Sequence, residues 1–286
     1  MWSKDDSPGS QSKQAIFAFV VLAFGWAWGF GFLAEQMKSS RPALGAAMSM
    51  LAGFGPSLAG VAVVGLFGGR VELRGWLARC LRWRISGLWY LLAFLTPPLL
   101  MVIALGLHVA FGGKLPDFPA LKQIPLAIAN FGVVLLVGGP LGEEFGWRGY
   151  LTPVLVARMR WRAASLVIGV VWGVWHLPLF FMSGTVQSQM AIAVFLVNIL
   201  AGSVLFGWLY ERTGPSVLPA MVLHTSLNAW AGILAIIPTE TLWRPYVFVT
   251  GLLLLVAVIL LLIPDRPILD GRQISSEGST NPARQA

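Results

Sequence analysis

Long apolar runs separated by short polar segments are the main pattern along this chain of 286 residues. A helix needs about 20 mostly apolar residues to cross the hydrocarbon core of a bilayer. Eight segments satisfy this condition, and the pattern predicts a transmembrane helix in each. These segments are residues 15–34, 46–68, 88–111, 124–150, 163–182, 189–210, 216–237 and 245–263. The fold class that follows is an all-α, polytopic membrane protein with about eight transmembrane helices.

The fourth segment, 124–150, is long and is interrupted by small and helix-breaking residues. These residues are Gly138, Gly139, Pro140 and Gly142. They predict a kink or an unwound turn at this point. Irregular backbone is tolerated at membrane depth only where neighbouring protein covers it. We therefore expect this part of the chain to lie against other helices, around a central polar cavity, and not against lipid.

Composition excludes a soluble domain. The chain is 57% apolar and 11% charged, with a mean hydropathy of +0.75, whereas soluble domains carry roughly 25% charged residues. A net charge of +8 would suggest nucleic-acid binding in a soluble protein. Here the Lys and Arg residues lie between apolar runs, so no nucleic-acid partner is expected. The single cysteine, Cys80, excludes an internal disulfide and a cysteine-based zinc framework.

The distribution of basic residues predicts the orientation. Of the 20 Lys and Arg residues, five fall in the loops after spans one, three, five and seven. The other 15 fall in the loops after spans two, four and six and in the two terminal segments. The five are Lys38, Arg41, Lys114, Lys122 and Arg244. Basic residues concentrate on the cytoplasmic side of membrane proteins. We therefore predict a multi-pass protein of the cell membrane with both termini in the cytoplasm.

Three parts of the chain are distinguished. Residues 1–123 carry the first three spans and a basic loop, Arg70–Arg84, which is interleaved with Leu and Trp. That loop is either an amphipathic helix on the anionic leaflet or a solvated basic loop with anchoring tryptophans. Residues 124–240 are the expected functional core, and residues 241–286 are the last span and a polar, disordered tail. The short polar N-terminus lacks the features of a removable signal peptide.

Two adjacent carboxylates are the most unusual feature of the apolar segments. Of the 12 acidic residues, only Glu143 and Glu144 lie within an apolar run, where a charge costs on the order of 2.5–3.5 kcal/mol. Arg148 follows Glu144 by four residues, which is the favourable order for a helical ion pair. Glu143 is about 100° away around the helix. An ion pair therefore accounts for Glu144, whereas Glu143 is predicted to be free.

Other polar residues occur on later spans at a comparable depth. His176 lies in span five, and His224 and Asn228 share one face of span seven. At 1.5 Å per residue, these groups lie roughly 11 Å (Glu143), 12 Å (His224), 18 Å (Asn228) and 20 Å (His176) below the cytoplasmic surface. Polar groups from three helices thus fall in one layer. We predict that they converge on one site, although hydrogen bonds that only pack the helices are the alternative.

These groups suggest hydrolysis of an amide bond. A free carboxylate beside a neutral imidazole can activate water as a general base. An imidazole and a carboxamide on one helical face can stabilise a developing oxyanion. His and Glu are also zinc ligands, so a metal held by Glu143, His176 and His224 is the alternative. The absence of an H-E-x-x-H sequence argues against the usual helical zinc motif. The cofactor is therefore predicted to be either none or one zinc ion.

A proton-coupled transporter is the main alternative outside the enzymes. Intramembrane Glu, His and Arg also build proton relays. Many transporters, however, contain inverted repeats with two matching broken helices, and this sequence has one broken segment and no repeat. An inactive scaffold or immunity protein is a further alternative.

The assembled motifs resemble those of the CPBP family, which comprises CAAX proteases and bacteriocin-processing (Abi) proteins. The resemblance covers about residues 124–240 and rests on three motifs in order. They are Glu143-Glu144-Phe145-Gly146-Trp147-Arg148, Trp172 to His176, and His224 to Asn228. Trp172 stands where many members have Phe. The order and spacing of the three motifs make the match specific.

The resemblance implies an eight-helix intramembrane endopeptidase acting on a membrane-associated peptide or protein. By position, it implies that Glu143 activates water with help from His176, that His224 and Asn228 form an oxyanion hole, and that Glu144 and Arg148 orient the site. Some members remove a C-terminal tripeptide after a prenylated Cys, and others process bacteriocin-like peptides. Members are described both as glutamate-dependent and as metalloproteases, so both mechanisms stay open here.

Overall fold

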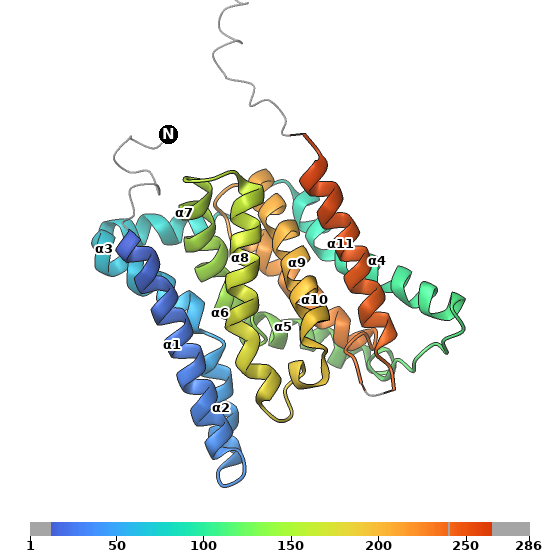
Figure 1. Ribbon diagram of the computed structural model, residues 1–286. Helices are drawn as coiled ribbons and strands as arrows, with labels where there is room; N and C mark the ends of the chain where they lie inside the picture. The colour runs from blue at the N-terminus through green and yellow to red at the C-terminus, as the bar shows by residue number, and fades with distance from the viewer. Residues whose placement is uncertain (1–12, 240, 265–286) are drawn as a thin grey trace, which may run out of the picture.

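The computed structural model describes residues 13–239 and 241–264, and all its regular elements are helices (Figure 1). The longer helices are α1 (Lys13–Met37), α2 (Pro42–Ala52), α3 (Gly55–Cys80), α4 (Gly87–Ala110), α5 (Ile124–Val137), α8 (Trp161–His176), α9 (Ile192–Thr213), α10 (Leu218–Ile233) and α11 (Arg244–Leu262). The shorter ones are η2 (Pro119–Lys122), α6 (Pro140–Glu144), η3 (Phe145–Leu151), α7 (Thr152–Val156), η4 (Leu177–Phe181) and η5 (Gln187–Gln189). The predicted disordered tail after Pro264 and the polar N-terminus before Lys13 lie outside the described residues.

The prediction of an all-α polytopic membrane protein is confirmed. Within the described part of the chain, seven helical segments are long and apolar enough to cross a membrane. They are Lys13–Met37, Gly55–Cys80, Gly87–Ala110, Ile124–Val156, Trp161–Phe181, Ile192–Thr213 and Arg244–Leu262. Large apolar side chains on their outer faces are exposed, for example Leu66 at 78% and Leu126 at 64%. In a membrane protein such a surface faces lipid.

The eighth predicted span, 216–237, is a shorter helix than the sequence indicated. Here α10 covers 16 residues, which is roughly 24 Å at 1.5 Å per residue and less than the hydrocarbon thickness of about 30 Å. It packs against α4, α5, α6 and α9. An interior helix of this kind need not match the bilayer thickness, because neighbouring helices cover its ends.

The predicted second span, 46–68, is wrong in its boundaries. Helix α2 ends at Ala52, and α3 begins at Gly55, so the chain turns within the predicted span. The turn lets α2 pack against α1. Pro42 and Pro56 stand in the first turns of the two helices, a position where proline costs no hydrogen bond.

The basic segment after the second span is helical as far as Cys80. Gly69 has a positive φ of 73° and separates this part of α3 from the part before it. Trp76 is buried and its indole N–H donates to the Gly149 carbonyl over 2.9 Å, while Trp83 beyond the helix is exposed. Residues 70–80 are therefore helical, with one face packed on protein, and their position on an anionic leaflet stays a prediction.

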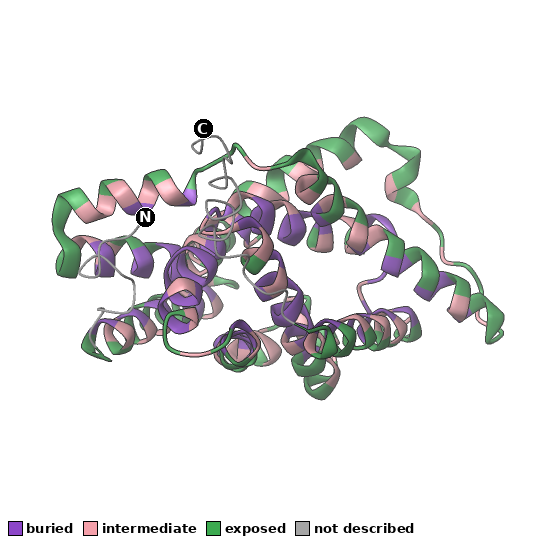
Figure 2. Cartoon of the chain, turned by 90° about the horizontal axis from the view of Figure 1, so that it is seen from above, coloured by how far each residue is buried: buried purple, intermediate pink, exposed green. Residues whose placement is uncertain are grey.

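The helices form a bundle in which the broken fourth segment is surrounded by other helices. The start of α1 and the end of α11 lie at the same end of the bundle, and the α1–α2 and α8–α9 connections lie at the other (Figure 1). Seen along the bundle, buried residues line the inner faces of the helices, and exposed residues lie on the periphery (Figure 2). The interior therefore provides the protein-covered environment that the predicted break requires.

A proline in α4 helps to fix α10. Pro98 has no backbone N–H, which frees the carbonyl of Phe94 one turn earlier. Ser226 of α10 donates its hydroxyl to that carbonyl over 2.6 Å. Because Ser226 lies between His224 and Asn228 in the same helix, this bond helps to hold the rotation of α10 that presents those two residues.

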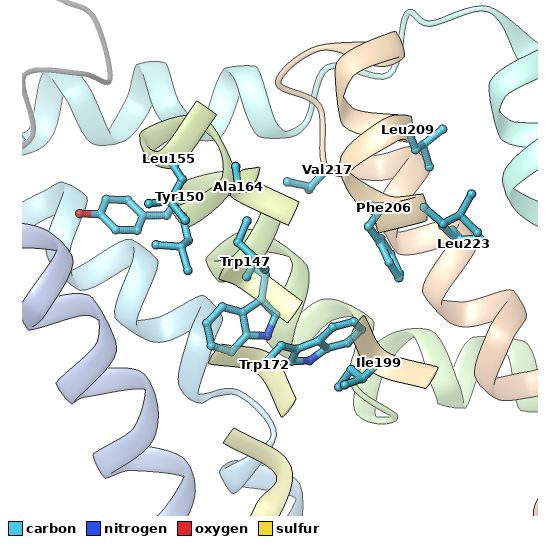
Figure 3. Packing of buried hydrophobic residues seen from close by; sticks show 14 of the residues in the cluster. Trp147, Tyr150, Leu155, Ala164, Trp172, Ile199, Phe206, Leu209, Val217 and Leu223 are labelled. Carbon is cyan, nitrogen blue, oxygen red and sulfur yellow. The ribbon is translucent and has the colours of Figure 1, made fainter. Parts of the chain in front are cut away.

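Aromatic side chains make up much of the core around the fourth segment (Figure 3). Trp147 is fully buried and packs edge-on against Phe19 and Trp175. Trp172 packs edge-on against Phe206. Rigid rings of this size exclude water and restrict the positions of neighbouring polar groups, so the packing prepares the site described next.

Candidate active site

The predicted break in the fourth segment is confirmed. Helix α5 ends at Val137, Gly139 has a positive φ of 114°, and α6 begins at Pro140. The chain then forms the π-helix η3, which carries Arg148. The π-helix is rare in proteins as a whole, and the single turns that do occur are often found at functional sites. Together, the break and the wide turn direct the polar side chains of this segment into the bundle.

Close backbone contact supports this segment from the side of α3. A Cβ atom added at Gly146 would overlap the backbone and ring of Pro56. The absence of a side chain at this position allows η3 to lie directly on α3.

The fourth segment is also longer than predicted. It continues to Val156, six residues beyond the predicted end at Tyr150. Glu143 is therefore roughly 20 Å along the helix from that end, compared with the predicted 11 Å. The carboxylates lie deeper in the bundle than the sequence indicated.

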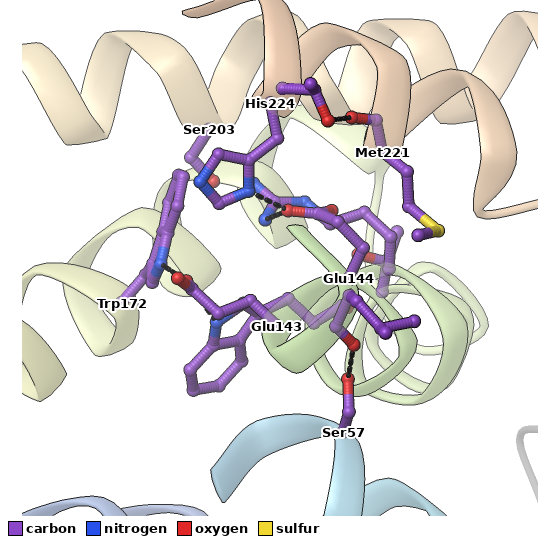
Figure 4. A network of polar contacts seen from close by, with 12 residues as sticks. Ser57, Glu143, Glu144, Trp172, Ser203, Met221 and His224 are labelled. Carbon is purple, nitrogen blue, oxygen red and sulfur yellow. Dashed lines mark hydrogen bonds and ion pairs between the residues drawn. The ribbon is translucent and has the colours of Figure 1, made fainter. Parts of the chain in front are cut away.

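Glu144 is the centre of a buried ionic cluster (Figure 4). Its Oε1 atom accepts hydrogen bonds from Arg148 Nη1 over 3.0 Å and from His224 Nδ1 over 2.7 Å. All three side chains are buried. The predicted pair of Glu144 and Arg148 is thus present. His224, expected to be a separate oxyanion donor, is bound to the same carboxylate through one of its two nitrogens.

Arg148 contacts two aromatic rings. Its guanidinium carbon lies 3.8 Å from the ring centroid of Phe206 and 4.4 Å from that of Trp172. A cation over an aromatic face is stabilised by the ring quadrupole. These contacts stabilise the guanidinium beside Glu144.

Glu143 is not free, which corrects the prediction from the sequence. Its Oε2 atom accepts hydrogen bonds from the indole N–H of Trp172 over 2.6 Å and from that of Trp147 over 3.3 Å. Trp147 lies four residues after Glu143, at the spacing where an ion pair would require a charged residue. The partner at this spacing is instead a neutral donor.

The second oxygen of Glu143 points toward Gly139. A Cβ atom at residue 139 would lie 2.7 Å from Glu143 Oε1 and 3.3 Å from His224 Nε2. Both atoms therefore approach the same point. Gly139 is required here twice, because its φ is positive and because a side chain would occupy the space between the carboxylate and the imidazole.

The remaining predicted residues complete the wall of the site. His176 donates its Nδ1–H to the Trp172 carbonyl over 2.8 Å, since a carbonyl can only accept, and Nε2 is the nitrogen left over. Its ring lines the same cavity as Glu143. Asn228 donates one side-chain N–H to the Gly138 carbonyl over 3.0 Å. That bond leaves a second N–H and the amide oxygen available.

A cavity of about 520 Å³ connects these residues with one end of the bundle. Glu143, His176, His224 and Asn228 all line it, together with Gly139. The lining continues through Met182 to Met190, in the α8–α9 connection, and through Ile236 and Ile237. Its outer part therefore lies at the end of the bundle opposite the start of α1 (Figure 1).

The alternative of a bound zinc ion is tested by the arrangement of its expected ligands. His224 donates from Nδ1 to Glu144 and His176 donates from Nδ1 to a carbonyl, an arrangement that metal-binding histidines share, since their Nε2 holds the ion. In the described ranges, however, no three His, Cys, Asp or Glu side chains form a group that could hold a metal. Glu143, His176 and His224 are thus not an assembled metal cluster in this arrangement, and no step below is derived through a metal.

Sequence reasoning missed four residues of the site: Gly139 as a spacer, Trp147 and Trp172 as donors to a carboxylate, and Phe206 as a stacking surface. A signal was present for Trp147, at helical spacing from Glu143. None was present for Phe206, because its position depends on how α9 packs against α8.

Comparison with known proteins agrees with the resemblance seen in the motifs. Residues 125–230 match the family described as Rce1-like type II CAAX prenyl endopeptidases. A curated protein named CAAX prenyl protease 2, from Methanococcus maripaludis, is 27% identical over 176 residues. The match covers 59% of this chain and 63% of that protein, which is less than two thirds of its length. The matched family region contains all six predicted site residues.

Proposed function

We propose that this chain, whose residues 125–230 belong to the CPBP/CAAX protease family, is an intramembrane endopeptidase. Its substrate is a membrane-associated peptide or protein, and the nucleophile is water activated by Glu143. The observation that carries the proposal is the arrangement of this carboxylate. Two indole N–H groups hold Oε2, while Oε1 is directed to the point that it shares with His224 Nε2 at the cavity wall.

Glu143 acts as the general base. A water molecule beside Oε1 gives a proton to the carboxylate, and the hydroxide attacks the carbonyl carbon of the scissile peptide bond. The same proton then passes to the leaving nitrogen, so that the carbon–nitrogen bond breaks to give a carboxylic acid and an amine. His176 supports this step by presenting Nε2 to the cavity close to Glu143.

His224 and Asn228 stabilise the oxyanion of the tetrahedral intermediate. Glu144 accepts a hydrogen bond from Nδ1 of His224, so Nε2 can donate when the ring is an imidazolium. Asn228 contributes its second side-chain N–H. Glu144 and Arg148 position His224 and touch no substrate.

The proposal is tested with purified protein in liposomes and quenched fluorescent peptides that insert in the membrane. We expect cleavage at an internal peptide bond, identified by mass spectrometry of both products. Protein that cleaves none of a peptide library in lipid, yet moves protons or a solute across the membrane, would show that the transporter alternative is correct.

Removal of the proposed oxyanion donors should slow cleavage without preventing binding. His224→Ala and Asn228→Ala are each expected to lower the turnover number about 100–1,000-fold, the usual value of one such donor. Because these groups act on the transition state, the dissociation constant of the peptide should change little. Turnover numbers and peptide binding are measured on the same preparations. A parallel loss of binding would contradict the assignment.

We further propose that both termini face the cytoplasm of the cell, so that the outer part of the cavity lies on the external side. The chain offers a simple test, because its single cysteine, Cys80, is buried. A membrane-impermeant maleimide should label Gln189→Cys, in η5, on intact cells. It should label Ala157→Cys, at the other end of the bundle, only after permeabilisation. Both residues are exposed, and the reverse pattern would contradict the orientation.

A further inference from the structure

We propose that the surface helix, residues 70–80 at the end of α3, binds the headgroups of anionic phospholipids, and that this contact raises the rate of peptide cleavage. The lipid-binding face of the helix consists of Arg70, Val71, Arg74 and Ala78, together with the adjoining Leu81. The effect on cleavage rests on the proposed endopeptidase function, whereas the lipid contact does not depend on it.

The surface helix is set at an angle to the long helices of the bundle. Gly69, with its positive φ, separates it from the first part of α3. It runs across the end of the bundle at which α1 begins, whereas α1, α8 and α9 run along the bundle (Figure 1). When the long helices cross a membrane, a helix in this position lies along the membrane surface, where amphipathic helices bind lipid.

The two faces of the surface helix differ in composition. The inner face packs against the hydrophobic core of the bundle through Leu73, Trp76, Leu77 and Cys80. On the lipid-binding face, Val71 is 85% exposed beside two exposed arginines. Apolar and basic side chains that share one exposed face are typical of helices that lie among lipid headgroups.

The exposed arginines lack a counter-charge from the protein. Arg70 and Arg74 form no hydrogen bond or ion pair within the part of the chain that the structure describes. Glu72, on the same helix, is paired with Arg79 over 2.6 Å, and the other described carboxylate at this end of the bundle is the exposed Glu211 of α9. The phosphate groups of anionic lipids supply the missing negative charge.

The inner face of the surface helix holds the segment that carries the ionic cluster. The indole N–H of Trp76 donates to the Gly149 carbonyl over 2.9 Å, and its ring packs edge-on against Phe145. These two partners lie in η3, next to Arg148 and Glu144 in the sequence. The position of the surface helix therefore affects the position of the ion pair.

The same helix also holds the start of α10. The backbone N–H of Val217 donates to the Cys80 carbonyl over 3.0 Å. Just beyond the helix, Arg82 donates to the Thr213 carbonyl, at the end of α9, over 2.7 Å. Because α10 carries His224, displacement of the surface helix would disturb both halves of the candidate site.

Anionic lipid favours the packed position of the surface helix over a displaced one. Arg70 and Arg74 are four residues apart, so the helix brings two like charges together, which opposes its formation. Headgroup phosphates on both arginines remove this repulsion, and they do so most effectively when the helix is formed. A ligand shifts an equilibrium toward the state that it binds better. Lipid binding should therefore stabilise the arrangement of η3 and α10 that the site requires.

Cleavage in defined lipids tests the effect on activity. An uncharged internal peptide, which continues beyond the scissile bond on both sides, is cleaved in liposomes of phosphatidylcholine and in liposomes with equal parts of phosphatidylcholine and phosphatidylglycerol. We expect kcat/KM to be at least about fivefold higher in the mixture, at the lower end of typical coupling between two sites. Equal values in the two lipids would overturn the effect on cleavage.

Two double variants identify the face that responds to the lipid. Arg70→Gln/Arg74→Gln should lose the stimulation by phosphatidylglycerol. Lys114→Gln/Lys122→Gln removes the same charge from two exposed residues between α4 and α5 and should retain it. Equal responses of the two double variants would overturn the inference.

Lipid contact is measured separately from cleavage. A fluorophore on Ala78→Cys reports from the lipid-binding face, since Ala78 is exposed and Cys80 is buried. Nitroxide-labelled phosphatidylglycerol should associate with this site at least about fivefold more strongly than nitroxide-labelled phosphatidylcholine, as expected for at least one basic contact. Arg70→Gln/Arg74→Gln should remove the preference. Protein that cleaves no peptide would overturn the endopeptidase function, and the quenching would still decide the lipid contact. Equal quenching by the two lipids would overturn the inference.

A pair of tryptophan variants tests the connection to the site. Trp76→Phe keeps a buried ring and removes the N–H that meets Gly149, whereas Trp83→Phe makes the same change at an exposed position beyond the helix. Trp76→Phe should retain the lipid preference measured by quenching but lose most of the stimulation of cleavage. Trp83→Phe should retain both. Full stimulation of Trp76→Phe would overturn the proposed coupling between the surface helix and η3.

Discussion

Glu143→Gln is expected to lower peptide cleavage by about 100- to 10,000-fold, the range by which general bases accelerate reactions. The amide has the shape of the carboxylate, and its oxygen can still accept the indole N–H groups of Trp147 and Trp172. The group directed to Gly139 would then be an NH₂, which donates hydrogen bonds and cannot take a proton from water. The variant should therefore fold normally and lack the base.

Three measurements make this expectation decisive. Turnover is measured with the internal peptide, folding is followed by thermal unfolding in detergent, and peptide binding is measured by titration. Glu211→Gln provides the matched control, because Glu211 is an exposed carboxylate at the far end of α9, and it should cleave at the normal rate. If Glu143→Gln formed the same products at an undiminished rate, another group would have to activate the water.

The elements of the fold could be predicted from the sequence to the extent that hydropathy determines them. Seven segments that cross a membrane and the break at Gly138 to Pro140 followed from apolar length and from helix-breaking residues. The turn between α2 and α3 did not, because Gly53 and Phe54 interrupt no apolar run. Hydropathy reports burial in lipid, and it does not distinguish a straight helix from a tight turn covered by α1.

In the candidate site, the residues could be predicted from the sequence, but several of their contacts could not. Glu143, Glu144, Arg148, His176, His224 and Asn228 were identified because polar groups are costly in lipid. The structure brings these residues together around one cavity. The partners of Glu143 were missed because tryptophan counts as apolar in such an argument, although its indole N–H is a strong donor. Which nitrogen of His224 meets Glu144 depends on the rotation of α10, and no local pattern encodes that rotation.

Arg148→Ala is expected to destabilise the fold as well as to abolish activity. Removal of one partner from a buried ion pair costs on the order of 3–5 kcal/mol, because the other charge remains buried without compensation. Here Glu144 would retain only His224, and the space that the guanidinium fills beside Trp172 and Phe206 would be empty. The apparent unfolding temperature in detergent should fall clearly below that of the unsubstituted protein. Unchanged unfolding would show that the pair has no structural role.

A double substitution distinguishes loss of charge from loss of packing. Arg148→Met fills most of the space beside the two rings without a charge, and Glu144→Gln removes the opposite charge. The pair is not ideally satisfied, because Glu144 Oε2 and Arg148 Nη2 are buried without a hydrogen-bond partner among the described residues. Buried ion pairs can be replaced by neutral groups at little cost.

The double variant should therefore unfold at a higher temperature than Arg148→Met alone. Two independent sites would not show this coupling. Its cleavage rate should stay low, since the double variant lacks both the carboxylate and the guanidinium that position His224 in the proposed mechanism. Additive effects on unfolding would contradict direct coupling of the two charges, and recovery of cleavage would contradict the proposed positioning of His224 by Glu144.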